Sequence, residues 1–180
     1  MVQICGLSPS YKRAPVTHEA WGLPWSPLNH RYSVWFEMHD RRIWEKRGPE
    51  YLDLLRMADV PIYMQQEWED IPNSVEYPLI SVISDVGCDY FQSSIAYMLG
   101  LAVFEHKDIE LYGVDNHEGD EFALERPCNE YMLGVAVGRG LQVWVHDSSS
   151  LLRFAPENAY LDDVVTYKPR YGWLETSPKA

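Results

Sequence analysis

The fold is decided by one stretch, which reads DYFQSSIAYMLGLAVFEHKDIELYGVD at 89–115 and ERPCNEYMLGVAVGRGLQVWVHD at 125–147. Its first part predicts an amphipathic helix from Tyr90 to about Glu105, with Asp89 at the N-cap position, where its carboxylate can accept from an amide of the first turn. The apolar residues that set this helical spacing are Phe91, Ile95, Met98, Leu99, Ala102 and Val103.

After this helix the pattern changes twice more. Residues 109–114 are short, apolar and partly β-branched, as in a buried strand, and residues 141–145 repeat that pattern. Between them lies a second helix that ends at Gly138 or Gly140, with Leu124, Cys128, Tyr131 and Val135 predicted on its inward face. Alternating helices and strands predict parallel strands joined by right-handed crossovers.

The rest of the chain supplies further elements of the same kind. Strands are predicted at 2–6, 20–22, 32–38 and 60–64, and a helix from Pro49 to about Ala58. Residues 77–86 suit a strand or a helix, and the absence of strict alternation favours a helix. The prediction is an α/β, Rossmann-like, mostly parallel sheet flanked by helices, as a single nucleotide-binding domain over 1–153. Residues 154–180 are predicted to form an irregular C-terminal arm packed on that domain.

The composition of the chain limits the classes of partner that it can bind. A formal charge of −12 over 180 residues argues against a nucleic acid polymer, because phosphate contacts need a basic face. Three cysteines without metal or redox spacing indicate a reduced, cytoplasmic setting. No apolar run approaches the ~20 residues of a membrane span. This composition is compatible with a nucleotide-derived small molecule as the ligand. It leaves open whether the protein forms a homo-oligomer, and it identifies no cofactor.

Ligands of open parallel sheets bind outside the carboxyl ends of the strands, so Asp115 and His146 are the first candidate residues. Asp115 suits a ribose hydroxyl or a metal, or else a structural turn. His146, beside Asp147, suits a general acid or base, or else a turn. These two are the predicted catalytic residues.

The loop after the first strand is a second candidate. Gly6, Ser8 and Ser10 have the composition of a phosphate loop, and equally of a tight strand-exit turn. Arg13 follows, as a phosphate ligand or a merely solubilising cation.

Two acidic groups of residues have alternative interpretations. Glu37, His39 and Asp40 follow a predicted strand, where they would bind a ligand hydroxyl or serve a structural role. The acidic run around 115–125 suits Mg²⁺ or a solvated loop, and the loop is favoured, so no metal site is predicted.

Three separated pieces carry a resemblance to known families: Gly6-Leu-Ser-Pro-Ser10, Ser93-Ser94-Ile95 and Gly113-Val-Asp115. They resemble the pattern shared by family-42 sialyltransferases and archaeal 6-hydroxymethylpterin diphosphokinase-like proteins. That resemblance implies a Rossmann-like fold that binds a nucleotide through these loops. Ser8 stands where the pattern has its second glycine, and Ile95 where it has the glycine after the serine.

Two further resemblances concern the central block. It is similar to a family of tailed-bacteriophage proteins that share YF-x-SS-x-A-x-M-L, L-Y-G-V-D, E-R-P-x-x-E-Y and G-R-G, which implies a phage source and a host-cell cytoplasm. Gly134-Val-Ala136 with Gly140 resembles a helix of nucleoside deoxyribosyltransferases. Met132 stands at the position of their nucleophile, and Glu130, nearby, either contacts the ligand or pairs with Arg126.

Together these patterns predict a phage-type protein that binds a nucleotide or nucleotide-derived small ligand and sequesters it without catalysis. The ligand would contact Gly6, Ser8, Ser10, Arg13, Ser93, Ser94, Asp115 and Glu130. The alternative is a nucleotide-sugar or nucleotide-dependent transferase that uses His146 and Asp115. Sequence leaves open whether the chain is an enzyme.

Overall fold

The computed structural model describes residues 1–16, 18–115, 120–147, 149, 151 and 152, of which 120–123 are described by backbone alone. The predicted C-terminal arm at 154–180 lies outside the described residues. So do positions 116–119 of the acidic run.

One sheet of seven strands runs through the molecule in the order β5-β4-β3-β2-β1-β6-β7. Every pair of neighbours is parallel, which confirms the predicted α/β class. The strands are β1 (Val2–Cys5), β2 (Ala20–Gly22), β3 (Val34–Phe36), β4 (Ile62–Met64), β5 (Ser74–Glu76), β6 (Ile109–Tyr112) and β7 (Val143–Val145).

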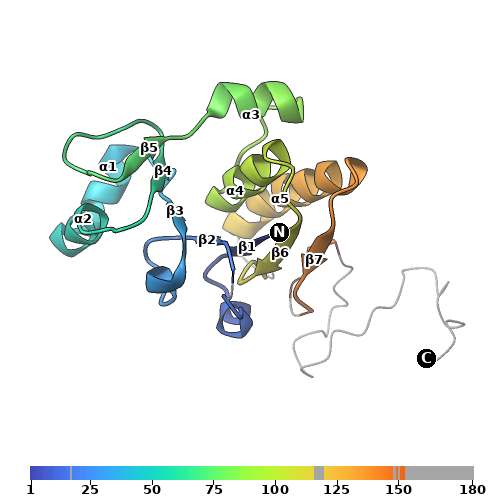
Figure 1. The fold of residues 1–180 in the computed structure, drawn as a ribbon, viewed down its shortest axis with the longest axis horizontal. Helices are drawn as coiled ribbons and strands as arrows, with labels where there is room; N and C mark the ends of the chain where they lie inside the picture. The colour runs from blue at the N-terminus through green and yellow to red at the C-terminus, as the bar shows by residue number, and fades with distance from the viewer. Residues whose placement is uncertain (17, 116–119, 148, 150, 153–180) are drawn as a thin grey trace, which may run out of the picture.

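Helices cover both faces of this sheet. The α-helices are α1 (Arg41–Trp44), α2 (Pro49–Arg56), α3 (Leu79–Val86), α4 (Ser94–Phe104) and α5 (Asp120–Gly138), and short 3-10 turns are η1 (Pro9–Arg13), η2 (Asn29–Arg31) and η3 (Glu45–Arg47). Figure 1 shows α4 and α5 side by side, with α1 and α2 grouped beside β3 and β4. The direction of the crossovers reverses after β5, and right-handed crossovers in opposite directions place their helices on opposite faces.

The apolar core is therefore divided by the sheet. Successive residues of a strand point to opposite faces, so Ile4 packs in the core under α4 and α5 while Cys5 packs in the core under α1 and α2. Leu111 and Tyr112 divide in the same way on β6. This alternation fills both layers from strands of only three or four residues.

Helix α4 is the centre of one layer. Eight of its residues are buried, because it packs against the sheet, α3 and α5 at once. Gly100 makes that closeness possible: a Cβ there would lie 2.8 Å from the Phe91 ring and 3.1 Å from Val82. A helix surrounded in this way is apolar on all sides.

Two predictions about these helices are wrong. The N-cap of α4 is Ser93, not Asp89, because the chain at 90–92 is not yet helical and the Ser93 hydroxyl accepts from the Ala96 amide at 3.1 Å. On α5, Leu124 and Tyr131 are exposed, although Cys128 is buried as predicted. The other buried apolar residues among its described side chains are Met132, Leu133 and Ala136. Apolar residues occur all round α5, so its periodicity does not single out the face that α4 covers.

One strand and one α-helix were not predicted. Strand β5 lies in what reads as a polar connection, and it is an edge strand supported by the Ser74 hydroxyl, which accepts from the Trp68 amide at 2.8 Å. Helix α1 begins at an Asp40 cap that accepts from the Arg42 amide at 2.9 Å. The helix predicted at 77–86 is confirmed as α3. In the described part of the chain, every helix is too short or too polar to cross a bilayer.

Candidate functional site

The strand order reverses between β1 and β6, so their crossovers leave in opposite directions and the loops at their carboxyl ends flank a topological switch point. Open α/β sheets bind ligands at such a point. The loop at 6–10 follows β1, Asp115 follows β6, and His146 follows β7. Since these strands are parallel, the prediction that all three lie at one edge of the sheet is confirmed.

Gly6 and Gly113 lie back to back in these two loops. A Cβ on Gly6 would lie 2.2 Å from the Gly113 carbonyl oxygen, and a Cβ on Gly113 would lie 2.7 Å from the Gly6 oxygen. Gly113 also has a φ of +65°, which favours glycine. From the sequence, Gly6 was interpreted as leaving room for a ligand. The close contact between the two loops already explains why both positions are glycine.

Ser10 and Asp115 join the same loops through buried hydrogen bonds. The Ser10 hydroxyl donates to Asp115 Oδ1 at 2.5 Å, and the Ser10 amide donates to Oδ2 at 3.2 Å. The Gly113 amide donates in turn to the Ser10 hydroxyl at 2.7 Å. These bonds, which we call the Ser10–Asp115 latch, engage both carboxylate oxygens, so the first role of Asp115 is to hold the β6 loop against η1.

Helix α4 points its N-terminus at this edge, because its C-terminal end leads directly into the amino end of β6. There the Ser93 hydroxyl donates to Asn129 Oδ1 at 2.9 Å. Asn129 is fully buried, and its Nδ2 has no hydrogen-bond partner among the described residues. Ser94, the first helical residue, is only half-buried. The N-terminus therefore combines first-turn amides with a buried amide group that is not satisfied.

A cysteine adjoins the same helix end. Cys128 is buried, and its thiol donates to the Glu125 carbonyl at 3.0 Å. Burial raises the pKa of the Cys128 thiol, although hydrogen bonds from the Gln92 amide and from Ser93 oppose the rise. A thiol with a raised pKa is a poor nucleophile at neutral pH, so Cys128 serves packing.

Of the remaining predicted site residues, some contact other parts of the protein and some are exposed to solvent. Glu130 forms the predicted i, i+4 pair with Arg126 at 2.9 Å and also accepts from the Leu152 amide at 2.9 Å. Ser8 makes no side-chain cap for η1, and Arg13 is exposed at the end of that turn. Of the predicted ligand contacts, Arg13 is thus exposed, Ser8, Ser94 and Glu130 are half-buried, and the others are buried.

His146 lies in an aromatic group at the end of β7. Its ring centre is 5.9 Å from that of Tyr112 and 5.7 Å from that of Trp144, and the residue is only 8% exposed. Beside it, the Ser149 hydroxyl donates to the Val114 carbonyl at 2.6 Å. This packing explains the position of His146 without a reaction, and a catalytic role stays a prediction.

Buried polar residues collect at the carboxyl edge. Of the nine that the described residues contain, only Gln3 lies within a strand, and the other eight follow strand ends or meet the N-terminus of α4. Those eight are Ser10, Ser26, Glu37, Ser93, Asp115, Asn129, His146 and Ser149. Sequence reasoning missed Ser26, Asn129 and Ser149, because a polar residue in a helix or loop gives no signal that it is buried.

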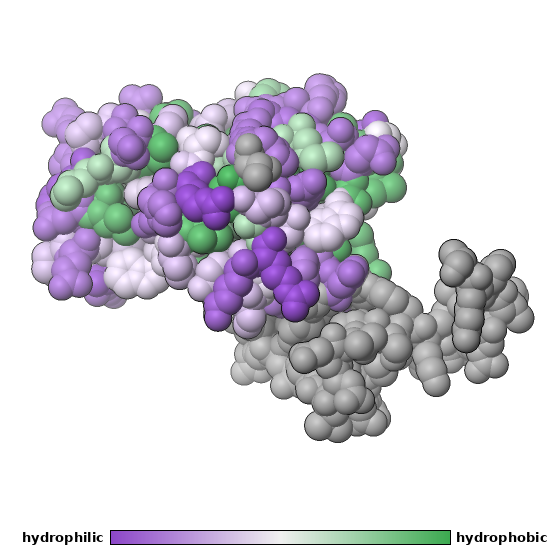
Figure 2. All heavy atoms as spheres, turned by 60° about the horizontal axis from the view of Figure 1, so that its bottom comes forward, coloured by the Kyte–Doolittle hydropathy of each residue, from purple (hydrophilic) through white to green (hydrophobic). Residues whose placement is uncertain are grey.

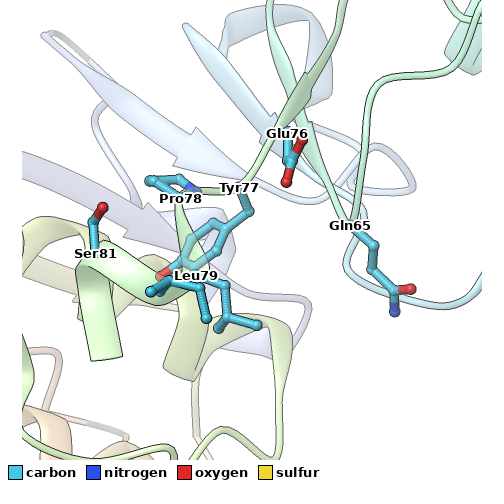
Figure 3. Close-up of a pocket in the computed structure, with 7 residues that line it drawn as sticks. Gln65, Glu76, Tyr77, Pro78, Leu79 and Ser81 are labelled. Atoms are coloured by element: carbon cyan, nitrogen blue, oxygen red, sulfur yellow. The ribbon is translucent and has the colours of Figure 1, made fainter. Parts of the chain in front are cut away.

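A pocket of about 360 Å³ opens farther along this edge. Figure 3 shows its walls coming from the ends of β4 and β5 and the start of α3, with Gln65 across from the Tyr77 ring. It lies at the low end of the ~300–1,000 Å³ range of ligand pockets. None of the predicted site residues lines it.

The described residues contain no group of three or more side chains able to hold a metal ion. Fold and edge together define an α/β protein with a parallel sheet and a polar carboxyl edge. Comparison of the chain with protein-family models, with curated proteins and with solved structures finds no match.

Proposed function

We propose that the protein binds a nucleotide-derived small molecule across the carboxyl edge, at the switch point between β1 and β6. One observation carries the proposal: eight of the nine buried polar residues in the described part of the chain lie at this edge. Burying polar groups costs free energy unless they are paired. Their concentration where parallel sheets bind ligands favours a binding role.

The N-terminus of α4 supplies the chemistry for a phosphate. The unpaired amides and the dipole of a helix N-terminus attract anions, and the unsatisfied Asn129 amide lies next to this one. Arg13 and Lys12 are exposed on η1, directly after β1, and α4 packs on that same strand. In a chain of charge −12, these exposed cations and this helix N-terminus, at the same edge of the sheet, favour a small anion there.

Binding is favoured over catalysis because both predicted catalytic residues already have a structural role. Asp115 is engaged in the Ser10–Asp115 latch, and His146 is packed among aromatic rings. We therefore infer that the ligand is held rather than transformed, which suits sequestration of a nucleotide signal.

Native mass spectrometry of the purified protein tests the proposal first, by detecting a co-purified nucleotide. Calorimetry with the identified compound, or with common nucleoside mono- and diphosphates, then measures affinity. Arg13→Ala should weaken binding by about 10- to 100-fold, as expected for a lost bond to a charged group.

Arg56→Ala is the matched control. Arg56 ends α2 near the amino end of β4, at the opposite edge, where its ion pairs with Asp53 and Asp70 are long and exposed. It should leave affinity unchanged. Equal affinity of the two variants for the nucleotide would show that η1 is not part of the binding site. The absence of any nucleotide binding would overturn the proposal.

A further inference from the structure

A second constellation of polar groups lies at the carboxyl end of β3. Glu37, the first residue after that strand, is 3% exposed. One of its oxygens accepts from the Tyr51 hydroxyl of α2. The other lies 2.5 Å from His39 Nδ1 and accepts from the His39 amide at 3.1 Å. Both oxygens are thus bonded.

The charge of Glu37 is retained despite its burial. Burial raises the pKa of a carboxyl group, but the hydrogen bonds from His39 and Tyr51 outweigh that effect, and the pKa of Glu37 is lowered. A buried carboxylate bonded to one ring nitrogen fixes the tautomer and orientation of an imidazole. Nδ1 of His39 then faces Glu37, and Nε2 lies on the far side of the ring.

A purely structural link between α2 and β3 would need only Glu37 and Tyr51. His39 adds a side chain that is 45% exposed and that is held by the buried carboxylate. Trp25, from the loop after β2, is 50% exposed and lies 4.9 Å from the Tyr51 ring. His39 is held by Glu37, and Trp25 packs on Tyr51, the other partner of Glu37. An oriented imidazole and an exposed aromatic side chain therefore flank one buried carboxylate, a composition that suits a hydroxylated ring compound.

The position fits the ligand considered above. β3 lies two strands from β1, or about 10 Å at the spacing of neighbouring strands. Glu37 meets α2 on one face of the sheet and α4 covers the other face, so a ligand that reaches both would lie across the carboxyl edge. We propose that Glu37 and His39 bind a ribose hydroxyl of the ligand while its base stacks on Trp25. This inference rests on the proposed function, with the phosphate at the N-terminus of α4.

Calorimetry with ribonucleoside 5′-monophosphates and their 2′-deoxy and 3′-deoxy counterparts tests this assignment. A site built to bond a hydroxyl rejects the analogue that lacks it. Wild-type protein should bind one of the deoxy counterparts about 10- to 100-fold more weakly than the ribonucleotide. In His39→Ala the two should bind equally, because the discriminating group is gone.

Two further sets of variants distinguish loss of this subsite from a general loss of structure. His30→Ala removes an exposed histidine of η2 and should keep the discrimination. Trp25→Leu should weaken all nucleotides, and Trp25→Phe should restore them, since stacking survives. Discrimination that persists in His39→Ala, or that is absent from wild type, overturns this inference and leaves the proposed function standing. Wild-type protein that binds no monophosphate overturns both.

Discussion

At the scale of single residues, Gly6 and Gly113 set how closely the β1 and β6 loops approach. Their backbones touch because neither has a side chain. Replacing Gly6 is therefore a test of packing, and a bulky residue there would not be a selective probe of ligand binding. The same loops are joined by the Ser10–Asp115 latch, so damage at one residue reaches the other.

Gly6→Ala should destabilise the protein by about 1–3 kcal/mol or more, because its Cβ would clash with backbone that has no room to move. Urea unfolding followed by circular dichroism measures the change. Gly134→Ala is the matched control: nothing lies within 4 Å of its Cβ position, and alanine is favoured over glycine inside a helix by ~1 kcal/mol. Similar behaviour of the two variants would contradict the packing account.

Glu37 makes stability depend on pH. Its pKa is lowered in the folded protein from an ordinary value of 4.5, so folding favours the ionised form. That contribution is fully present above the ordinary pKa and is lost as the pH falls through the lowered folded value. Wild-type protein should lose stability below about pH 4.5 more steeply than Glu37→Gln, which lacks the titrating group.

Urea unfolding at a series of pH values from 7 to 3 measures this difference. Other carboxylates with lowered pKa, such as Asp70 beside Arg41, contribute equally to both proteins and cancel in the comparison. Parallel stability curves for wild type and Glu37→Gln would show that Glu37 is not bonded in this way.

At the scale of elements, α4 depends on how it begins. The Ser93 hydroxyl accepts from the Ala96 amide and donates to Asn129 of α5, so one side chain both caps a helix and joins two helices. Asp89, which the sequence suggests as the cap, is exposed and lies before the helix starts.

Ser93→Ala should therefore cost about 1–2 kcal/mol, through the lost cap and the lost hydroxyl bond to Asn129 Oδ1, which keeps only the weaker contact with the Cys128 thiol. Asp89→Ala should stay within ~0.5 kcal/mol of wild type, as for most surface substitutions. Thermal unfolding of both variants separates the two positions. A larger loss of stability in Asp89→Ala than in Ser93→Ala would show that α4 begins at Asp89.

At the scale of the whole molecule, charge limits the choice of partner. The net charge is −12, and the face turned to the viewer in Figure 2 is largely hydrophilic, with hydrophobic patches scattered between polar residues. The cations of η1 and η2 are few: Lys12, Arg13 and Arg31. Such a local group suits one small anion and not a long strand of phosphates.

Random single-stranded DNA should accordingly give no change in fluorescence anisotropy at micromolar protein and physiological salt, where basic proteins bind non-specifically with Kd of about 10⁻⁴–10⁻⁶ M. Nucleotides titrated in the same buffer provide the comparison. Sub-micromolar, salt-sensitive binding to the DNA would place the polymer among the ligands and argue against a small-molecule site.

Sequence by itself determined the class of fold and most of its elements. Strands at 2–6, 20–22, 60–64 and 109–114 and the helix from Pro49 follow from composition and period, because backbone preference and burial of one face are properties of a short segment. The common edge of Gly6, Asp115 and His146 also follows, since parallel strands end on the same side.

Only the tertiary structure decided which residues meet there. Ser10 and Asp115 are 105 positions apart, and Ser93 and Asn129 are 36 apart, so no local pattern links them. The inward face of α5 was likewise set by α4, because apolar residues lie all round that helix. Burial of a polar group depends on neighbours brought in by the fold. For this reason the latch, the Asn129 amide and the bond from Tyr51 to Glu37 appear only in three dimensions, whereas Glu37 and His39 were grouped by the sequence itself.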